Sequence, residues 1–393
     1  MLIRVKSALP DFQPDLASRR PAASHASRAT LRDVAAWLLL AGCAVVGSAT
    51  LAGFAGRWWW RAELASHFRV QYLLLLACAA VLLWLLGRHW QAGLSGLLAG
   101  TNLVLVLPLY WAIAPAAPGP AGEIAPLVGA ASVYPGQSPT PGTMSPAAHR
   151  VGSLPMRAVT MNVHTFNRAH QRALDFVRQE SPDFVLVLEV GQAWAAALES
   201  LQAEYPYYHV EPREDHFGIA LFSRREPESL RVRALVWPEF PCLIAELTID
   251  GQSLSIIGAH PVPPVRKAGM AHRNHQLADL AQVVQRQQGE VVLLGDLNTT
   301  SWSPYFVDLL RETHLRDSRR GFGVQGTWPV GSPWLVIPID HCLVSPGIEV
   351  VNRRVGPDIG SDHYPVVVDF HLRPPSLAAR HRSDENRLPP HGS

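Results

Sequence analysis

The sequence predicts an α/β protein in which two β-sheets pack face to face with helices outside them, preceded by three transmembrane helices. Three observations lead to this fold class. The 393-residue chain is 48% hydrophobic and only 17% charged, and its apolar excess lies mostly before residue 115. Residues 151–373 alternate strand-like apolar runs with helical patterns. Between the two regions, residues 115–150 are rich in Pro, Gly, Ala and Ser without hydrophobic periodicity, which is typical of a linker.

Three uncharged stretches form most of the N-terminal region, at 34–56, 70–87 and 91–114. At 1.5 Å per residue, each stretch is long enough to cross a hydrocarbon core of about 30 Å. The first is too long for the apolar part of a signal peptide, and two more stretches follow it. A buried helical hairpin is the alternative for the second and third stretches. The aromatic residues Trp58–Trp60 and Tyr110–Trp111 favour membrane spans, because such residues suit the membrane interfaces.

The distribution of Lys and Arg predicts how these spans are oriented. Residues 1–33 form a basic tail with six Lys or Arg against three Asp, and Arg88 lies on the same side of a three-span arrangement. The opposite side carries Arg57, Arg61 and Arg69. Because loops rich in Lys and Arg stay in the cytoplasm, we expect a cytoplasmic N-terminus. The domain at 151–373 is then expected on the periplasmic or extracellular side, with the lipid bilayer as a partner.

The C-terminal tail and the cysteines carry two further predictions. The tail at 374–393 is polar and contains Pro-Pro pairs, so we expect it to be disordered. Four cysteines are too few and too scattered for a disulfide framework or a zinc site. Cys242 and Cys342 lie in strand-like segments, where free buried thiols are favoured over a disulfide between them.

The C-terminal domain contains recurrent apolar, strand-like runs. They lie at 157–163, 183–188, 217–222, 230–236, 242–249, 253–259, 291–295, 339–344 and 364–371. Helical patterns lie at 167–180, 191–204 and 266–288. The first of these helices is expected to begin at Asn167, which is a favoured capping residue. The order is β-α-β-α, then a run of strands, then a long helix and more strands, and it indicates two packed sheets with helices outside.

Polar side chains gather where these strands begin or end. They are Asn162, Glu189, His260, Asp296 and Asn298 after strands, Asp340–His341 after Val-Ile-Pro-Ile, and Asp362–His363 before Tyr-Pro-Val-Val-Val. Taken singly, each has an ordinary explanation as a turn residue, a helix cap or a loop histidine. Their joint occurrence in this order predicts a site, because α/β folds place their sites at strand ends on one rim of a sheet.

The residue types indicate the chemistry of that site. Carboxylate and amide oxygens are hard ligands that suit Mg²⁺ or Mn²⁺ rather than zinc. Such an ion neutralises phosphate charge and stabilises the leaving oxygen. A histidine backed by a carboxylate accepts a proton from water, and a second His or an Asn donates to phosphoryl oxygens as charge builds. No Cys or Ser stands in an obvious nucleophile motif, so the sequence favours metal-dependent hydrolysis of a phosphate ester by direct attack of water.

Four segments resemble the signature set of the endonuclease/exonuclease/phosphatase superfamily, which is DNase I-like. They are Thr160–Val163, Val187–Val190, Gly295–Asn298 and Ser361–His363. Three further segments, at 259–261, 327–329 and 339–341, are most similar to its bacterial membrane-anchored members. The four-motif set is specific although no single motif is, and the resemblance covers about 157–371. It implies a four-layer α/β sandwich and a location in a bacterial inner or plasma membrane.

The resemblance also implies a role for each matching residue. The implied metal ligands are Asn162, Glu189 and Asp362. Asp296 and Asn298 would orient the attacking water and contact the phosphate. His363 would be the general base paired with Asp340, and His260 the second catalytic histidine. Open roles remain for His341, where many relatives carry an aromatic or aliphatic residue, and for His164.

The motifs leave the substrate open between nucleic acid and a lipid or small-molecule phosphate ester, because nucleases, sphingomyelinases and inositol-phosphate phosphatases share the core site. Residues 157–373 contain 20 Arg or Lys and 25 Asp or Glu, a net charge of −5. A nonspecific nuclease usually needs a positive stripe, and only Arg224–Arg225, Arg231 and Arg233 offer a local one. A non-catalytic membrane receptor on the same fold is disfavoured, because degenerate relatives lose the metal Glu or the Asp–His pair. No protein partner is indicated.

Overall fold

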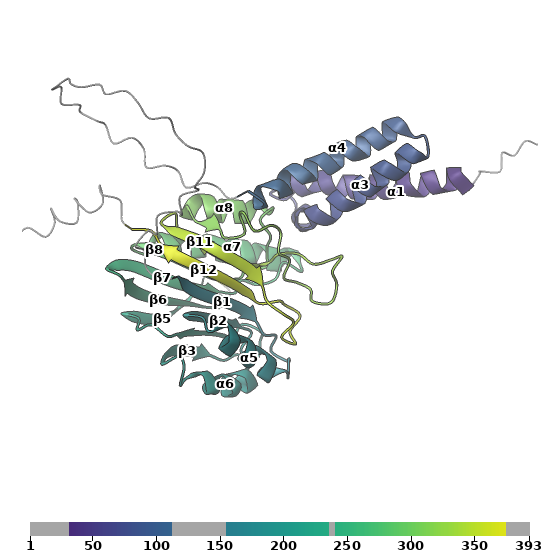
Figure 1. Cartoon of the computed structure of the whole chain (residues 1–393). Helices are drawn as coiled ribbons and strands as arrows, with labels where there is room; N and C mark the ends of the chain where they lie inside the picture. The colour runs from purple at the N-terminus through teal and green to yellow at the C-terminus, as the bar shows by residue number, and fades with distance from the viewer. Residues whose placement is uncertain (1–30, 112–154, 236–239, 375–393) are drawn as a thin grey trace, which may run out of the picture.

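The computed structural model describes residues 31–111, 155–235 and 240–374. The basic tail up to residue 30, the linker expected at 115–150 and the tail from residue 375 lie outside the described residues. What is described forms a helical N-terminal region and an α/β domain that begins at residue 155 (Figure 1).

Within the described residues, three helical stretches are long and apolar enough to cross a membrane, at Leu31–Ala55, Trp60–Leu85 and His89–Leu109. They are built from α1 (Leu31–Ala52), α2 (Trp60–Ala65), α3 (Arg69–Leu85) and α4 (His89–Val106), with short 3₁₀ turns between or after them. Leucines such as Leu38, Leu74 and Leu97 remain exposed on their outer faces. Apolar surface of this extent needs a partner, and three long apolar helices indicate a membrane anchor. The expected spans are confirmed as helices, although the second begins at Trp60 rather than at residue 70.

The α/β domain, as described, contains two six-stranded mixed sheets. The first has the order β11-β12-β1-β2-β4-β3. Its strands are β1 (Met156–Asn162), β2 (Phe184–Leu188), β3 (Tyr207–Glu211), β4 (Ile219–Ser223), β11 (Ile348–Val355) and β12 (Val366–Leu372). The second has the order β5-β6-β7-β8-β10-β9. Its strands are β5 (Ser229–Ala234), β6 (Pro241–Ile249), β7 (Gln252–Ala259), β8 (Glu290–Asp296), β9 (Arg316–Asp317) and β10 (Asp340–Val344).

Side chains that alternate between the two faces of each strand pack the two sheets against each other and against helices, which gives four layers. In β2, Phe184 and Leu186 enter the core between the sheets, whereas Val185 and Val187 face the helices α5 (His170–Glu180) and α6 (Gln192–Leu198). A third cluster packs the other sheet against α7 (Lys267–Gln285) and α8 (Pro304–Thr313). Because side chains of a strand alternate between faces, a strand buried on both faces is apolar throughout, as β2 is. The predicted fold class, two packed sheets flanked by helices, is confirmed.

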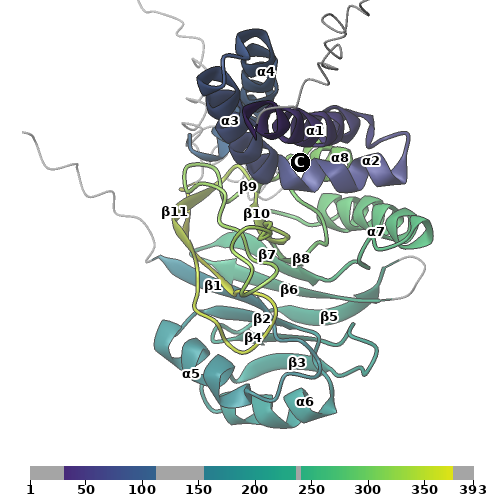
Figure 2. The same cartoon turned by 90° about the vertical axis from the view of Figure 1, so that its right-hand side faces the viewer.

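Strand register brings the polar strand ends to one rim. The parallel pair β1–β2 sets Asn162 opposite Leu188, so Glu189 follows immediately beside it. In the other sheet, the antiparallel pair β8–β10 sets Asp296 directly opposite Asp340. The N-terminal helices lie over the α7 and α8 side of the domain (Figure 2), where Arg57 forms an ion pair of 2.7 Å with Asp308 of α8.

Three details differ from the sequence-based expectation or extend it. Helix α5 begins at His170 and not at Asn167, because the Asn167 side chain accepts a hydrogen bond from the Ala169 N–H (2.8 Å) and forms a turn ahead of the helix. Helix α8 and strands β3, β9 and β11 were not predicted. Cys242 and Cys342 are both buried and free, as expected.

Candidate active site

A cavity of about 620 Å³ opens where the ends of the strands from the two sheets meet. Its polar lining consists of Glu189, His260, Asp296, Asn298, Asp362 and His363, together with His164, Asp215 and His216. Apolar side chains make up much of the remaining wall. Three residues of the N-terminal helical region, Leu64, His67 and Phe68, complete it, so that region forms part of this cavity.

A buried histidine–carboxylate pair lies at the centre of the site. His363 donates from Nδ1 to Asp340 Oδ2 at 2.9 Å, and its Nε2 lies 3.7 Å from Asp296 Oδ2. Burial alone would lower the pKa of His363, but the carboxylates of Asp340 and Asp296 outweigh it and raise this pKa above its ordinary value. The bond to Asp340 fixes the ring so that Nε2 points toward Asp296, which leaves one ring nitrogen for chemistry.

Asp296 connects the remaining catalytic candidates. Its Oδ2 lies 3.4 Å from His260 Nε2 and accepts a hydrogen bond from Asn162 Nδ2 at 3.3 Å, while its Oδ1 accepts from the Asn298 N–H at 2.9 Å. Burial lowers the pKa of His260, but the nearby carboxylates, Asp296 first, raise it to a net value above the ordinary one. The carboxylate therefore sits between two histidines, and both of its oxygens are held.

The expected metal ligands line or border the same cavity. Asn162 Nδ2 donates to Glu189 Oε1 at 2.9 Å, and Glu189 is half-buried at the cavity wall. Burial would raise the pKa of Glu189, but His260 and the Asn162 amide lower it overall, so the carboxylate is ionised. Asp362 is exposed and accepts a hydrogen bond from the Trp328 indole at 3.0 Å. These oxygen donors fit a divalent cation, since two carboxylates face one cavity and the Asn162 amide lies directly beside one of them.

His341 lies behind the site rather than in it. Its Nδ1 accepts from Arg319 at 3.3 Å and its Nε2 donates to the Thr299 carbonyl at 2.8 Å. Burial and the Arg319 charge lower the pKa of His341 to about 3, so the ring is neutral. His341 thus supports the loop that follows Asn298.

Sequence reasoning missed a network that ties the N-terminal helical region to this loop. Glu63 is the only acidic residue in the apolar stretch 60–85. It is fully buried, pairs with Arg273 of α7 at 2.9 Å and accepts from Ser303 Oγ at 2.7 Å. Arg273 in turn donates to the Asn298 carbonyl at 2.8 Å. A lone acidic residue between two long apolar stretches was the available signal, because a buried charge needs a partner.

Two mixed sheets packed face to face, with acid–histidine pairs on the shared rim, define a protein of the DNase I-like α/β-sandwich class. The model of the Endonuclease/Exonuclease/phosphatase family matches residues 159–363, and the chain belongs to this family. Members of the family are generally metal-dependent phosphoesterases, hydrolases that act on phosphate esters.

The domain is also similar to solved structures, each of which covers 56% of this chain. A humanized TDP2 from D. rerio is 15% identical, with 99% of its own chain covered and a TM-score of 0.47. Endonuclease/exonuclease/phosphatase proteins from Bacteroides vulgatus and Beutenbergia cavernae are 18% and 22% identical, with 100% and 72% of their chains covered and TM-scores of 0.47 and 0.45. No curated protein matches the sequence.

Proposed function

We propose that the chain is a membrane-anchored, metal-dependent phosphoesterase in which water attacks phosphorus directly. The observation that carries this proposal is the buried Asp340–His363–Asp296 arrangement facing a cavity with Glu189 on its wall. Asn162, Glu189 and Asp362 are the residues proposed to hold a divalent cation. When bound, such a cation neutralises phosphate charge and offsets the carboxylate field around His363.

The protein groups then divide the proton transfers. His363 Nε2 accepts a proton from water as the oxygen–phosphorus bond forms, and Asp340 stabilises the resulting imidazolium. His260, whose pKa is raised, donates hydrogen bonds to the phosphoryl oxygens as negative charge builds. Asn298 and Asp296 orient the water and the phosphate. The bond from phosphorus to the leaving oxygen breaks, that oxygen takes a proton from solvent, and His363 returns the proton it accepted to solvent.

A substrate panel tests this function with the full chain in detergent or nanodiscs. We expect hydrolysis of at least one ester among plasmid DNA, RNA, sphingomyelin, phosphoinositides and bis-p-nitrophenyl phosphate in the presence of Mg²⁺ or Mn²⁺, with loss of activity in EDTA and recovery on adding the metal. No hydrolysis of any ester, with a folded chain, would favour the non-catalytic receptor. Full activity in the chelator, unaffected by added metal, would refute the metal-dependent mechanism.

We further propose that the substrate is an amphiphilic phosphate ester from the membrane rather than a nucleic acid. The cavity wall combines Leu64 and Phe68 of the membrane anchor with Phe217 and Val265 of the domain. Val265 is 72% exposed at this wall. A polyanionic nucleic acid gains little from such a wall, and the net charge of −5 over 157–373 opposes it. An alkyl chain gains about 0.8 kcal/mol for each CH₂ group that it buries.

The loop at 329–337 gives this proposal a second support. Trp334 and Leu335 are 81% and 56% exposed on it, and its Val336 carbonyl accepts from Gln71 of α3 at 3.0 Å. An exposed tryptophan on a loop that contacts the start of α3 suits a membrane interface. The cavity, whose wall includes the neighbouring Ile337, would therefore open near the lipid headgroups.

One matched pair of variants separates the two substrate classes. Val265→Asp places a charge on the cavity wall, and Val351→Asp places one at a half-exposed position on β11 outside it. We expect Val265→Asp to reduce hydrolysis of a lipid phosphate ester in vesicles at least about tenfold, while bis-p-nitrophenyl phosphate is hydrolysed normally. Val351→Asp should change neither rate. If plasmid DNA is cleaved faster than any lipid ester, the proposal of an amphiphilic substrate is wrong, whereas the proposal of a phosphoesterase stands.

We also propose that the active site faces the periplasm or the exterior, as the charge distribution predicts. A phosphatase reporter that is active only outside the cytoplasm should be active when fused after residue 150 and inactive when fused after Arg32. The reverse pattern would place the site in the cytoplasm. It would show that Arg57, Arg61 and Arg69 outweigh the basic N-terminal tail in setting the orientation.

A further inference from the structure

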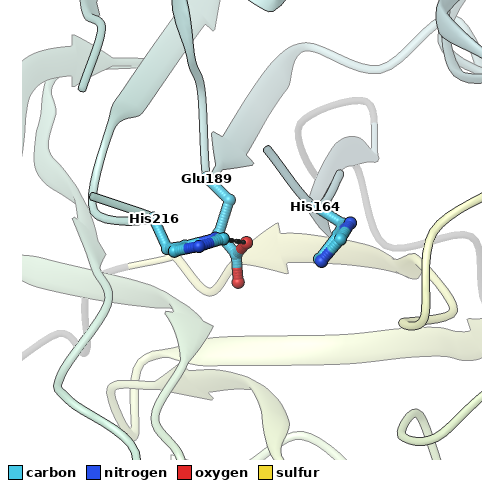
Figure 3. A group of neighbouring side chains, drawn as sticks. All are labelled: His164, Glu189 and His216. Atoms are coloured by element: carbon cyan, nitrogen blue, oxygen red, sulfur yellow. Dashed lines mark hydrogen bonds and ion pairs between the residues drawn. The ribbon is translucent and has the colours of Figure 1, made fainter. Parts of the chain in front are cut away.

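Three side chains that the catalytic scheme leaves without a joint role meet at the wall of the cavity. His164 follows β1, Glu189 follows β2, and His216 precedes β4. Figure 3 shows the two imidazole rings on either side of the carboxylate. One ligand atom from each residue lies within 4.8 Å of the others, and His216 Nδ1 lies 3.1 Å from Glu189 Oε2. All three residues are half-buried and line the cavity, so solvent and a dissolved ion reach them.

The backbone at all three positions is left-handed. The φ angles are 57° at His164, 61° at Glu189 and 71° at His216. Residues other than glycine rarely adopt this conformation, and they hold it only where the surroundings enforce it. Here the Trp194 indole and the Asn167 N–H donate to the His164 carbonyl, and Thr165 Oγ1 donates to the Glu189 carbonyl. Hydrogen bonds thus maintain the uncommon turns at His164 and Glu189, and the turn at His216 brings its ring to the same carboxylate.

The cluster differs from an ordinary surface ion pair between a histidine and a glutamate. Such a pair occurs on β3, where His209 Nε2 lies 3.5 Å from Glu211 Oε2. Both partners there belong to one strand, and no third His, Cys, Asp or Glu among the described residues joins them within ligand distance. The cluster at the cavity instead draws on three separate segments. Phe166 packs edge-on against both of its rings, with centroid distances of 6.0 Å to His164 and 5.1 Å to His216.

The donor set points to a particular kind of ion. Imidazole nitrogens suit zinc and other transition metals, whereas Mg²⁺ prefers oxygen donors. Two histidines and one glutamate leaving an open position form a donor set used by catalytic zinc sites. Donors at 2.0–2.1 Å from a tetrahedral ion are about 3.3 Å apart. The 3.1 Å between His216 Nδ1 and Glu189 Oε2 is close to that separation.

We propose that His164, Glu189 and His216 bind one transition-metal ion of the Zn²⁺ or Mn²⁺ class in the active-site cavity. Glu189 would contribute Oε2, which lies 3.1 Å from His216 Nδ1, to this ion, while its Oε1 stays beside the Asn162 amide. The inference rests on the proposed function only in placing the ion in the same cavity, because binding of the ion is measurable without any substrate.

Metal binding to the full chain, stripped with a chelator and dialysed, tests the proposal. Isothermal titration with Zn²⁺, Mn²⁺ and Mg²⁺ gives affinity and stoichiometry, and the visible absorption of added Co²⁺ reports a site with nitrogen ligands. The variants are His164→Ala, His216→Ala and the double variant, with His209→Ala as the matched control, since that histidine also lies beside a glutamate. Circular dichroism establishes that each variant is folded.

We expect wild type and His209→Ala to bind one more Zn²⁺ per chain than the double variant. Each single variant should bind it at least about tenfold more weakly, and the Co²⁺ spectrum should be lost in the double variant. Equal stoichiometry and affinity in the double variant and wild type, or tighter binding of Mg²⁺ than of Zn²⁺ and Mn²⁺, would overturn the site. Zn²⁺ binding without hydrolysis of any ester would refute the proposed function alone. Hydrolysis of an ester together with unchanged Zn²⁺ binding in the double variant would refute this inference alone.

Discussion

Replacing His363 tests the proposed general base directly. His363 is 4% exposed, donates to Asp340 at 2.9 Å and lines the cavity. Loss of a positioned base typically lowers a rate 10²–10⁴-fold, which is about 3–5 kcal/mol of activation free energy. We therefore expect His363→Ala to lower kcat at least about a hundredfold at saturating metal.

Removing the ring also leaves the Asp340 carboxylate without its imidazole partner, so stability needs its own control. His363→Gln can still donate to Asp340 from its amide but cannot accept a proton from water. We expect it to be as inactive as His363→Ala while unfolding at a higher temperature. Thermal unfolding followed by circular dichroism separates the two effects.

A double-mutant cycle shows whether Asp340 acts through His363. Asp340→Asn should impair the same step, so the double variant should be much less impaired than the product of the two single effects. The assay is kcat at saturating metal on the ester that the panel identifies. If His363→Ala retains more than about a tenth of the wild-type kcat, this histidine is not the base. Asp296, 3.7 Å from Nε2, would then be the leading candidate.

Three further outcomes follow from the contacts described. Asn162→Ala should weaken metal affinity in a calorimetric titration and be partly rescued by high metal concentration; a lower kcat at saturating metal instead would assign Asn162 to catalysis. Glu63→Ala removes the acidic partner of the buried Arg273 guanidinium and should destabilise the folded chain by about 3–5 kcal/mol. The exposed-site variant Glu349→Ala is the control. An unchanged unfolding midpoint in Glu63→Ala would contradict a stabilising Glu63–Arg273 pair. Burial raises the pKa of Asp317 but Arg319 lowers it further, so the folded pKa lies below the unfolded value of about 3.9. The contribution of Asp317 to stability is therefore complete above that value and is lost as pH falls through the folded pKa. The unfolding midpoint of wild type should exceed that of Asp317→Asn at pH 7 and approach it on acidification, and a pH-independent difference would contradict this.

The buried Glu63–Arg273 pair has a consequence for how the two regions work together. Arg273 connects the membrane anchor to the backbone of Asn298, and His67 Nδ1 lies 3.0 Å from Thr300 Oγ1 in the same loop. The loop that carries Asp296 and Asn298 is thus held from both sides, by the anchor and by His341. A domain cut free of its anchor would lose one of these supports and part of the cavity wall, and for this reason the tests above use the full chain.

Local patterns in the sequence determined the elements of this protein and the contents of its catalytic rim. Uncharged runs predicted the helices of the anchor, because a bilayer demands about 20 apolar residues. Apolar runs predicted β1, β2 and β8 within a residue or two, because strands buried on both faces admit few polar side chains. Asn162 and Asp340 were predicted to share a rim because each stands at a strand terminus, Asn162 at the end of β1 and Asp340 at the start of β10. The short edge strand β9 carries too weak a local signal and was missed.

Tertiary packing alone decided which distant residues meet. His216 has no motif around it, and it became part of the site only when the turn before β4 placed its ring against Glu189. Glu63 was an unexplained charge until α2 packed on α7 and supplied Arg273. The sequence left the role of His341 open, and alternation along β10 turns it to the face opposite Asp340. The physical reason is the same in each case. Hydrophobic periodicity is a property of neighbouring residues, whereas ion pairs and metal sites depend on separations that only the packed sheets and helices set.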